Sequence, residues 1–487
     1  MAFKTPGVYV KEISSLPPSV AQVETAIPAF IGYTMKKNHK GKELKNNPVR
    51  ISSLKEFEEI FGITEGIVFE NNGSKIELKE EDEEVKLADE INDPYEKLNS
   101  RLYYALRMFY GNGGGACYII SCGSADEIPS GSDKKNAHND ALDKLKKEDE
   151  PTMIVMPELP GMDQGDFYGV YKEALKQCGE LKNRVVLIDL YVPEVEEGEK
   201  DFEDVADDFR SAIGNNHLKY GIAYYPWLET SMNYMYDEAS LEITFDGTTP
   251  PEFDQSDPIY LRKEEEDVDD NTKDSLYHVD GELYNEIKKQ IDDYKVILPP
   301  SAAMAGVYAF VDRTRGVWKA PANVSLNMVR NPMVKIDDEE QRSMNVHTTG
   351  KSVNAIREFT GKGILVWGAR TLAGNDNEWR YVPVRRFYIM VEESVKKATT
   401  PFVFEPNDAT TWKRVRAMIE NFLTLQWRDG ALQGAIPDEA FFVSVGLGET
   451  MTAQDILEGR MIVEIGMAVV RPAEFIILRF SHKMAEA

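Results

Sequence analysis

The region between residues 101 and 228 alternates short apolar segments with amphipathic ones, and this alternation constrains the fold more than any other feature. Short apolar runs predict buried strands, and the amphipathic stretches between them predict helices. The expected strands are ACYIIS, PTMIVMPEL, RVVLIDL and KYGIAYYPWL, and the expected helices are RLYYALRMFY, the region 168–182 and the segment with Phe209 and Ile213. Strands and helices that alternate in this way form a sheet covered on both faces. The sequence therefore predicts an α/β fold, with mixed α+β character where the alternation stops.

At 487 residues the chain is too long for one compact core, so several domains are expected. Two acidic segments interrupt the α/β pattern, and we interpret both as surface insertions. The first spans residues 65–100 and contains EEDEE at 80–84. The second spans residues 231–282 and contains EEEDVDD at 264–270.

The net charge of −27 is distributed unevenly along the chain. Residues 1–300 hold 33 Lys and Arg against 61 Asp and Glu, a net of −28. Residues 301–487 hold 23 against 22, a net of +1. A strongly acidic surface repels nucleic acid and anionic lipid, so neither is expected as a partner of this chain.

The cysteines, the first residues and the hydropathy indicate where the chain is made. An odd number of cysteines, Cys117, Cys122 and Cys178, is a poor disulfide framework and suggests a reducing compartment. The opening MAFKTPGVYVKEI lacks the basic start and the apolar run of a secretion signal. No segment approaches the ~20 apolar residues that are needed to span a bilayer. We therefore expect a soluble chain made in the cytoplasm, with no direct membrane insertion.

Short motifs of enzymes occur in the chain, but each lacks the context that its chemistry needs. GNGGGA at 111–116 matches a dinucleotide-binding turn, which requires a strand before the glycines and a helix after them. Here a predicted helix precedes the glycines and a predicted strand follows, so a glycine-rich helix stop fits better. Ser52 and Lys55 have an S-x-x-K spacing without the partner motifs of that acylase class. Helix capping, with Ser53 as the N-cap, is the favoured interpretation there.

The residue types that bind metals are scattered or lack a ligand pattern. The six histidines have no second ligand at metal-binding spacing, and the acidic runs lack the alternating ligands and central glycine of a calcium loop. Cys117 and Cys122 are expected to be strand residues and not a redox pair. We therefore predict no catalytic residue, no cofactor and no metal site. A nucleotide-binding α/β enzyme is kept as the alternative, because of GNGGGA and the central α/β pattern.

Two amphipathic helices are expected in the last third of the chain, at 383–397 and 409–428. The second places one stripe of residues toward a core, namely Trp412, Val415, Ile419, Phe422 and Gln426. It also carries a net charge of +3 from Lys413, Arg414, Arg416 and Arg428 against Glu420. Three of these cations lie in its first half, where the helix dipole disfavours positive charge. Two interpretations stay open: a solvated helix face, or an electrostatic contact with an acidic partner surface.

Both ends of the chain are predicted to be extended arms. In TPGVYVKEI a Pro-Gly turn precedes Val8, Tyr9 and Val10, which favour a strand, and the tether SSLPPSV separates this strand from AIPAFIGYT. Near the other end, AEFIILRF is apolar enough for a strand and contains Phe475, Ile476, Ile477 and Leu478. A strand held away from its own domain has unpaired edges, and another subunit can supply its partner.

Several long motifs, in order along the chain, resemble the contractile tail sheath family of phages and related injection particles. They begin with TPGVYVKEI, AIPAFIGYT and FYGNGGGACYII. They continue with PPSAAMAGVYAFVDRTRGVWKAPAN at 299–323, NAIREFTGKGILVWGARTL at 354–372, EWRYVPVRRFYIMVEESV at 378–395, FEPNDATTWKRVRAMIENFL at 404–423, GALQGAIPDEAFFV at 430–443 and RPAEFIILRF at 471–480. The resemblance covers both termini and nearly all of residues 299–480. It is weaker through 124–298, and the two acidic insertions depart from it.

The resemblance implies a multi-domain sheath protein whose inner α/β domain is formed with both termini. The implied parts are an arm strand and tether at 1–25, outer inserted α/β domains at 26–298, an inner domain at 299–470 and a C-terminal arm strand at 471–487. The arm strands Val8–Val10 and Phe475–Leu478 would add to the inner-domain sheets of neighbouring subunits.

The resemblance also implies a structural function and no enzyme activity. Subunits of this family stack as rings in a helical homo-oligomer around an inner tube, and contraction drives the tube through a target membrane. Baseplate proteins and a tail terminator or cap protein are implied as further partners. Of the basic helix, Lys413, Arg414 and Arg416 would face the tube.

The kind of particle stays open between a phage tail, a tailocin and a cell-targeting injection system. In each case the particle is assembled in the cytoplasm, with release to the outside as a further expectation. A type VI secretion sheath fits less well, because that system splits its sheath between two chains. A non-contractile tube protein also fits less well, since such proteins are single small domains.

Overall fold

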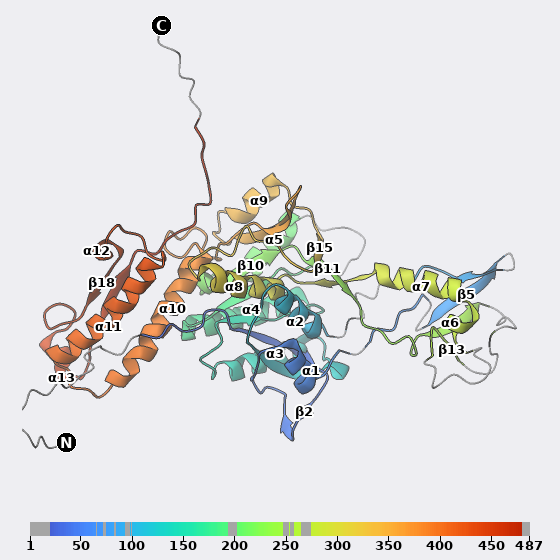
Figure 1. Cartoon of the computed structure of the whole chain (residues 1–487), viewed down its shortest axis with the longest axis horizontal. Helices are drawn as coiled ribbons and strands as arrows, with labels where there is room; N and C mark the ends of the chain where they lie inside the picture. The colour runs from blue at the N-terminus through green and yellow to red at the C-terminus, as the bar shows by residue number, and fades with distance from the viewer. Residues whose placement is uncertain are drawn as a thin grey trace, which may run out of the picture. The chain divides into compact units, whose positions relative to one another are not determined.

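The structure is a computed structural model that describes residues 20–64, 66–71, 75–81, 84–92, 98, 100–192, 202–246, 253, 258–263 and 274–479. The chain divides into two compact units (Figure 1). The larger unit spans Thr25–Arg386, and the smaller unit combines Met1–Glu24 with Phe387–Ala487. The predicted arm strand at Val8, Tyr9 and Val10 lies outside the described residues.

An eight-stranded sheet forms the core of the larger unit, in the order β17-β16-β10-β9-β8-β1-β7-β4. Its six central strands are parallel, whereas the outermost strands β17 and β4 run antiparallel to their neighbours. The strands are β1 (Pro28–Thr34), β4 (Val49–Ile51), β7 (Cys117–Ser124), β8 (Met153–Val155), β9 (Val185–Asp189), β10 (Gly221–Tyr225), β16 (Val353–Phe359) and β17 (Gly363–Val366). Every residue of β1, β9 and β10 is buried, as expected for strands covered on both faces.

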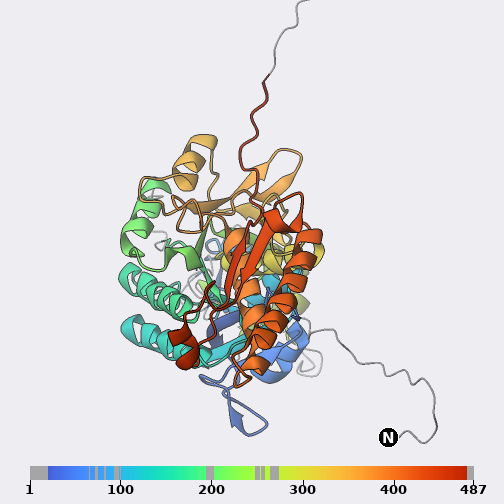
Figure 2. The same ribbon diagram turned by 90° about the vertical axis from the view of Figure 1, so that its left-hand side faces the viewer.

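Two pairs of helices pack on this sheet: α3 contacts α4, and α2 contacts α8 (Figures 1 and 2). The helices that surround the sheet are α1 (Leu54–Phe61), α2 (Leu102–Gly111), α3 (Gly131–Leu145), α4 (Gln164–Leu181), α5 (Phe202–Ala212), α8 (Ser301–Arg315) and α9 (Asp338–Asn345). Ser53 is the N-cap of α1, and its side chain accepts a hydrogen bond from the backbone N–H of Glu56. The predicted α/β alternation and this predicted cap are confirmed.

A buried carboxylate fixes the N-terminus of α8 against the sheet. Asp189, the last residue of β9, accepts hydrogen bonds from the backbone N–H of Ser301 at 2.9 Å and from its hydroxyl at 2.6 Å. The hydroxyl of Tyr171 donates a third, at 3.3 Å. Burial raises the pKa of Asp189 to about 7, and these three donors oppose that rise. The carboxylate therefore serves as a long-range helix cap.

The two acidic insertions, predicted as separate surface segments, come together in one four-stranded sheet. Its order is β13-β12-β5-β6, with β5 (Ile76–Glu81), β6 (Glu84–Leu87), β12 (Glu242–Asp246) and β13 (Ile259–Tyr260). Strand β5 from the first insertion pairs in parallel with β12 from the second, with Ile76 opposite Ile243. Helices α6 (Leu276–Val279) and α7 (Gly281–Asp293) follow, and α7 packs against β6. The sequence predicted the positions of the insertions but not that they pair.

A smaller three-stranded sheet, in the order β14-β11-β15, also belongs to the larger unit. Its strands are β11 (Leu228–Asn233), β14 (Lys295–Leu298) and β15 (Val329–Pro332), and all pair antiparallel. β14 ends just before α8, and β15 precedes α9, so this sheet joins the acidic insertions to the segments that complete the large sheet.

The smaller unit is built mainly from two long helices and a two-stranded sheet (Figure 2). Helix α10 (Val382–Thr399) begins in the larger unit and continues into the smaller one, where α11 (Ala409–Arg428) follows. Strands β18 (Phe441–Ser444) and β19 (Glu464–Met467) pair antiparallel, and β18 packs against α11. The short helices α12 (Pro437–Ala440) and α13 (Ala453–Leu457) complete the unit. The helices predicted at 383–397 and 409–428 are confirmed.

The boundary between the compact units lies at 386/387, whereas the inner domain was predicted to begin at residue 299. Residues 299–386 group with the larger unit because β16 and β17 extend its eight-stranded sheet next to β10. The assignment of inner and outer positions around a sheath axis stays a prediction.

Candidate functional site

The glycine run at 111–115 lies at the amino edge of the large sheet. Helix α2 ends at Gly111, and β7 begins at Cys117, so the glycines follow a helix C-terminus. That helix end carries the negative pole of the dipole, and ligand phosphates bind at the opposite pole. Packing explains Gly114, where a Cβ would lie 2.6 Å from the Phe109 ring, and backbone conformation explains Gly113, which has φ +99°. The predicted helix stop is confirmed, and this motif is not a dinucleotide turn.

The carboxyl edge of the sheet is where ligands bind in open α/β folds, in the crevice between strands whose connections leave in opposite directions. Here those strands are β1 and β8, because the chain passes from β1 to β7 on one side and from β8 to β9 on the other. Glu158, which follows β8, occupies this position and is buried. Its Oε1 accepts hydrogen bonds from the Ser100 hydroxyl at 2.8 Å and from the Leu102 N–H at 2.6 Å. Glu158 thus ties the start of α2 to the segment after β8, and burial raises the pKa of its carboxyl group.

A surface hollow of about 680 Å³ lies beside this crevice, lined by the ends of β1 and β7 and by α3. Cys122 is one of the residues that line this hollow, and it is the one cysteine among them, so it is the candidate for a soft nucleophile there. Burial raises the pKa of its thiol well above the usual range, and Glu158 adds to that rise. A thiol held protonated is a poor nucleophile. All three cysteines are free and buried, so the prediction that Cys117 and Cys122 are strand residues is confirmed.

His138 on α3 is the one fully buried histidine among the described residues. Its Nδ1 donates to the backbone carbonyl of Lys134 at 2.9 Å, and its ring meets Tyr33 edge-on at 5.8 Å between centroids. Burial lowers its pKa to about 4, although the bond to Lys134 acts in the opposite direction. His138 is therefore neutral and structural at pH 7.

We predict that His138 makes the fold less stable in mild acid. The unfolded chain binds a proton near pH 6.5 and the folded chain only near pH 4, so the free energy of unfolding falls as the pH drops between these values. The loss reaches about 3 kcal/mol over that window, at ~1.4 kcal/mol per pKa unit. Chemical denaturation of the chain and of His138→Phe from pH 7 to pH 4 measures it, because other titrating groups cancel in the difference. A difference that does not change with pH would contradict the prediction.

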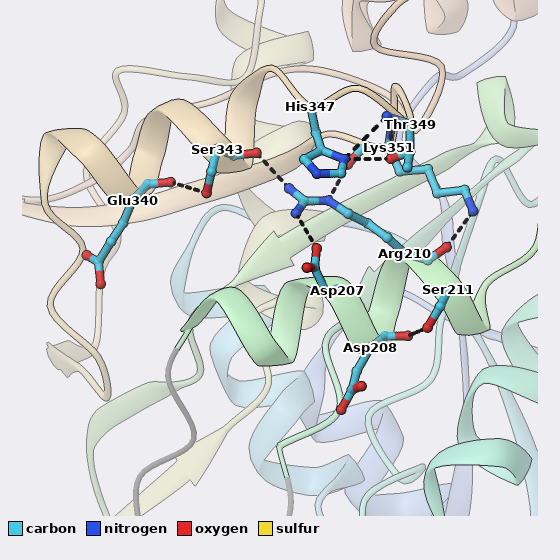
Figure 3. Close-up of polar contacts among 9 residues, drawn as sticks. All are labelled: Asp207, Asp208, Arg210, Ser211, Glu340, Ser343, His347, Thr349 and Lys351. Atoms are coloured by element: carbon cyan, nitrogen blue, oxygen red, sulfur yellow. Dashed lines mark hydrogen bonds and ion pairs between the residues drawn. The ribbon is translucent and has the colours of Figure 1, made fainter.

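Arg210 ties α5 to the segment after α9 in a polar network (Figure 3). Its Nη1 bonds to Asp207 at 3.1 Å and its Nη2 to the Ser343 carbonyl at 2.6 Å. The ammonium group of Lys351 donates to the backbone carbonyl of Arg210, and Arg210 Nε donates to that of Lys351. These bonds join α5 to α9 and to Lys351, and each of the three guanidinium nitrogens of Arg210 donates one of them.

The same network contains a histidine and a serine, but not in a catalytic arrangement (Figure 3). His347 Nδ1 lies 2.9 Å from the Thr349 hydroxyl, and burial together with the charge of Arg210 lowers its pKa. The Ser343 hydroxyl donates to the carbonyl of Glu340 within its own helix, so it does not reach His347. A nucleophile must bond to its base, which this pair does not do. The network is structural.

Within the described part of the chain, no group of three or more His, Cys, Asp or Glu side chains could hold a metal ion. Over the same residues, no helix has both the length and the hydropathy that crossing a membrane requires.

The basic helix α11 buries the predicted stripe and exposes part of its positive charge. Val415, Ile419, Phe422 and Gln426 are buried, and Trp412 is half-buried. The helix begins at the N-cap Asp408, whose carboxylate accepts hydrogen bonds from the N–H groups of Thr410 and Thr411. This negative cap offsets part of the cost of placing cations near a helix N-terminus.

The three predicted contact residues of α11 are not equivalent. Lys413 and Arg414 are exposed, and the guanidinium of Arg414 lies 5.7 Å from the centre of the Phe402 ring. Arg416 instead bonds to Glu449 at 2.6 Å and to the carbonyl of Val445. The structure therefore brings two of the three cations to one exposed surface and uses the third inside the smaller unit.

An apolar segment follows the two-stranded sheet β18–β19, with which no further strand pairs within the described residues. Beyond β19, residues 468–470 pair with 431–433 through the Leu432–Val469 bridge. Residues 471–479 belong to no helix or strand in the single chain. The predicted arm residues Phe475, Ile476, Ile477 and Leu478 lie there with between 69% and 79% of their surface exposed.

Known proteins resemble this chain over part or all of its length. Residues 374–483 match the family model described as the phage tail sheath C-terminal domain. A chain in the solved helical sheath of the anti-feeding prophage, in the contracted state, is 30% identical, with 99% of this chain and 100% of that chain covered and a TM-score of 0.62. This chain belongs to the tail sheath family.

The sheath-family match includes most of the smaller unit: α10, α11, β18 and β19 all fall within residues 374–483. A chain in the solved sheath complex of PVC, an extracellular contractile injection system in the contracted state, is 29% identical over 99% of both chains, with a TM-score of 0.62. A prophage major tail sheath protein of Pseudomonas aeruginosa is 26% identical over 36% of this chain. That alignment spans 44% of the Pseudomonas protein. The tail sheath protein of phage T4 is 23% identical over 28% of this chain, and this alignment spans 21% of the T4 protein. The family resemblance and the predicted fold class are confirmed.

Proposed function

We propose that this chain is the structural subunit of a contractile sheath that polymerises helically around an inner tube. The observation that carries the proposal is the likeness over the full length to sheath chains, one of them solved as a helical sheath in the contracted state. The bonds that tie Glu158 to the start of α2 and the protonated thiol of Cys122 support a structural protein and not an enzyme.

Assembly by strand addition is supported by where the free sheet edges lie. The outer edge of β17 is bonded to residues 323–326, for example from Asn323 N–H to the Val366 carbonyl and from Leu326 N–H to the Ile364 carbonyl. At the other end of the large sheet, β4 has only three residues and follows Pro48, which cannot donate to a neighbouring strand. No further strand pairs with the sheet β18–β19 within the described residues, although the Met467 carbonyl of β19 accepts a hydrogen bond from the Tyr388 hydroxyl. An arm from another copy would add to it through backbone hydrogen bonds.

The arms proposed for this role are Val8–Val10 and Phe475–Leu478. The C-terminal arm exposes four large apolar side chains in a row, which is costly in water and favourable in a sheet. Because each copy gives arms and accepts arms, the contacts propagate head to tail without closing, which produces a long sheath.

Contraction would follow from two packings of the same array. If the contracted array is more stable by a few kcal/mol per subunit, many subunits together drive the tube through a membrane without a nucleotide. The arms keep subunits joined while their bodies move. The exposed cations Lys413 and Arg414 would hold the tube in the extended state, through a contact weak enough to break.

The further partners that we propose are an inner tube protein, baseplate proteins and a terminator or cap protein. We also propose that the particle assembles in the cytoplasm and is released from the cell. The acidic insertions would keep it soluble, because like charges on outer surfaces prevent sideways association.

Negative-stain electron microscopy of the chain co-expressed with its neighbouring tube gene tests the function. The expected result is long hollow cylinders with helical striations, in two classes of different width. Particles of monomer size only, over a range of salt concentrations, would overturn the proposal.

In the same assay, deletion of residues 1–12 is expected to leave a folded chain that forms no contractile sheath. The deletion removes the proposed arm strand Val8–Val10 and retains residues 20–25, which are tied to the folded units. Circular dichroism monitors the fold, and microscopy counts the tubes. Unchanged tubes would exclude strand addition by this arm.

A further inference from the structure

The chain passes between its two compact units twice, at 24/25 and at 386/387. The residues of the larger unit at these two points, Thr25 and Arg386, are bonded to each other. Arg386 Nη2 donates to the backbone carbonyl of Thr25 at 2.9 Å, although the two residues are 361 positions apart. Both crossings therefore leave the larger unit from one place.

A single carboxylate on α8 holds both crossing residues. Asp312 accepts two hydrogen bonds from Arg386, from Nη1 to Oδ1 at 2.9 Å and from Nη2 to Oδ2 at 2.6 Å. The hydroxyl of Thr25 donates a third to Oδ2. The side chains of Arg386 and Asp312 are 4% and 6% exposed, so this bidentate pair is almost dry.

Aromatic groups complete the surroundings of Arg386. Its guanidinium lies 4.5 Å from the centre of the Tyr308 ring, and the Tyr308 hydroxyl is 2.7 Å from that of Tyr224 on β10. Burial alone would lower the pKa of Arg386, but the charge and hydrogen bonds of Asp312 outweigh burial and raise it. The cation is therefore permanent, and its position is fixed from the sheet, from α8 and from residue 25.

The smaller unit holds the same N-terminal segment from its own side. The backbone N–H of Val23 donates to the hydroxyl of Ser394, a buried residue of α10, at 3.0 Å. The side chain of Gln22 bonds to Gln426 of α11 at 3.3 Å. Residues 22–25 are thus fixed at three successive points, and the residues that precede them are those of the proposed N-terminal arm.

Stability alone does not explain an ion pair at this place. Replacing a buried pair with apolar residues often leaves a protein equally stable, and in some proteins a buried pair instead specifies how segments are positioned. This pair joins three segments that are distant in sequence: residue 25, α8 and α10. An apolar contact is not directional, so it would keep these three segments in contact without fixing their relative positions.

We propose that Thr25, Asp312 and Arg386 form an anchor for the root of the N-terminal arm, so that a pull on the arm from a neighbouring subunit reaches the body of its own subunit. The proposal rests on the proposed sheath function. These are positioning residues, since they would act through the arm and touch no other subunit themselves.

The test replaces Thr25 with valine, which removes one hydroxyl and keeps the bidentate pair. Ser301→Ala is the control, because it also removes a hydroxyl bond to a carboxylate, the buried bond to Asp189, away from the crossings. Hydrogen exchange of the unassembled chain is expected to rise about tenfold at the Val23 amide in Thr25→Val and to stay unchanged there in Ser301→Ala. Unchanged exchange at Val23 in Thr25→Val would overturn the anchor.

Electron microscopy of sheaths after triggered contraction supplies the second readout. Thr25→Val is expected to give at least a twofold excess of broken or uncontracted sheaths over Ser301→Ala, and failure of the folded variant to assemble would also support the anchor. Intact contraction together with faster exchange would overturn it, since the bond would then matter only locally. Asp312→Asn, which weakens all three bonds, should exceed Thr25→Val in both readouts. A wild-type chain that forms no sheath would contradict the proposed function itself. Normal wild-type sheaths together with unaffected variants would contradict only the anchor.

Discussion

Replacing Ile476 and Ile477 with proline is expected to abolish sheath formation and to change the free energy of unfolding of the single chain by less than about 0.5 kcal/mol. Both side chains are more than three-quarters exposed and belong to no helix or strand, so the fold loses nothing. In a strand, neighbouring N–H groups point to opposite edges. Whichever edge of the arm pairs with another copy, one proline removes a donor from it.

The control for the proline variant is Ile476→Thr with Ile477→Thr. Threonine keeps the N–H group and the β-branched shape but removes apolar surface, so these chains should form fewer sheaths without losing them entirely. The four arm side chains stand to gain about 6 kcal/mol or more on burial, at ~1.5–3 kcal/mol each, before the cost of ordering the arm. Thermal unfolding and microscopy of both variants measure the effects. Normal cylinders from the proline variant would exclude pairing through this arm.

The α/β core was predictable because its signals are local. The strands β7, β8, β9 and β10 are short apolar runs between amphipathic segments, and each such run had to be covered on both faces, whereas β16 contains Asn354, Arg357 and Glu358 and lacks this signal. The pairing of the two acidic insertions was not predictable in the same way. Ile76 and Leu78 alternate with charged residues, as do Leu241 and Ile243, so strands could have been found. Their partnership joins segments far apart in sequence, which periodicity does not encode.

The candidate assembly site was predictable from charge and hydropathy only in part. The exposed cations Lys413 and Arg414 follow from the helical stripe, since they lie off its apolar face. The partner of Arg416 does not, because Glu449 lies 33 positions away in a loop. The Arg386–Asp312 pair could not be predicted from the sequence for the same reason, because both residues lie in helices among other charges and only the fold brings them together.

Lys413→Glu combined with Arg414→Glu is expected to reduce the yield of sheath assembled around the tube at least tenfold, without loss of thermal stability. The two side chains are exposed, and new carboxylates in the first half of α11 suit the helix dipole, so the fold is expected to be unchanged or slightly stabilised. Higher salt should weaken assembly of the wild-type chain, because exposed charges are screened beyond ~10 Å at 0.1 M salt. The difference in sheath yield between the wild-type chain and the variant should therefore become smaller as salt is raised.

Two single variants of the same helix show whether position or net charge decides the outcome. Arg428→Glu lies at the last turn of α11, roughly 20 Å from Lys413 at 1.5 Å per residue, and should leave assembly near normal if the contact is local. Arg416→Glu places two carboxylates together at Glu449, so it should lower the free energy of unfolding by about 1 kcal/mol and affect assembly only through the fold. Thermal unfolding of the chain and counts of sheathed tubes separate these effects. Parallel loss of stability and assembly in the Lys413 and Arg414 variant would mean that this face of the helix supports the fold and that the tube binds elsewhere.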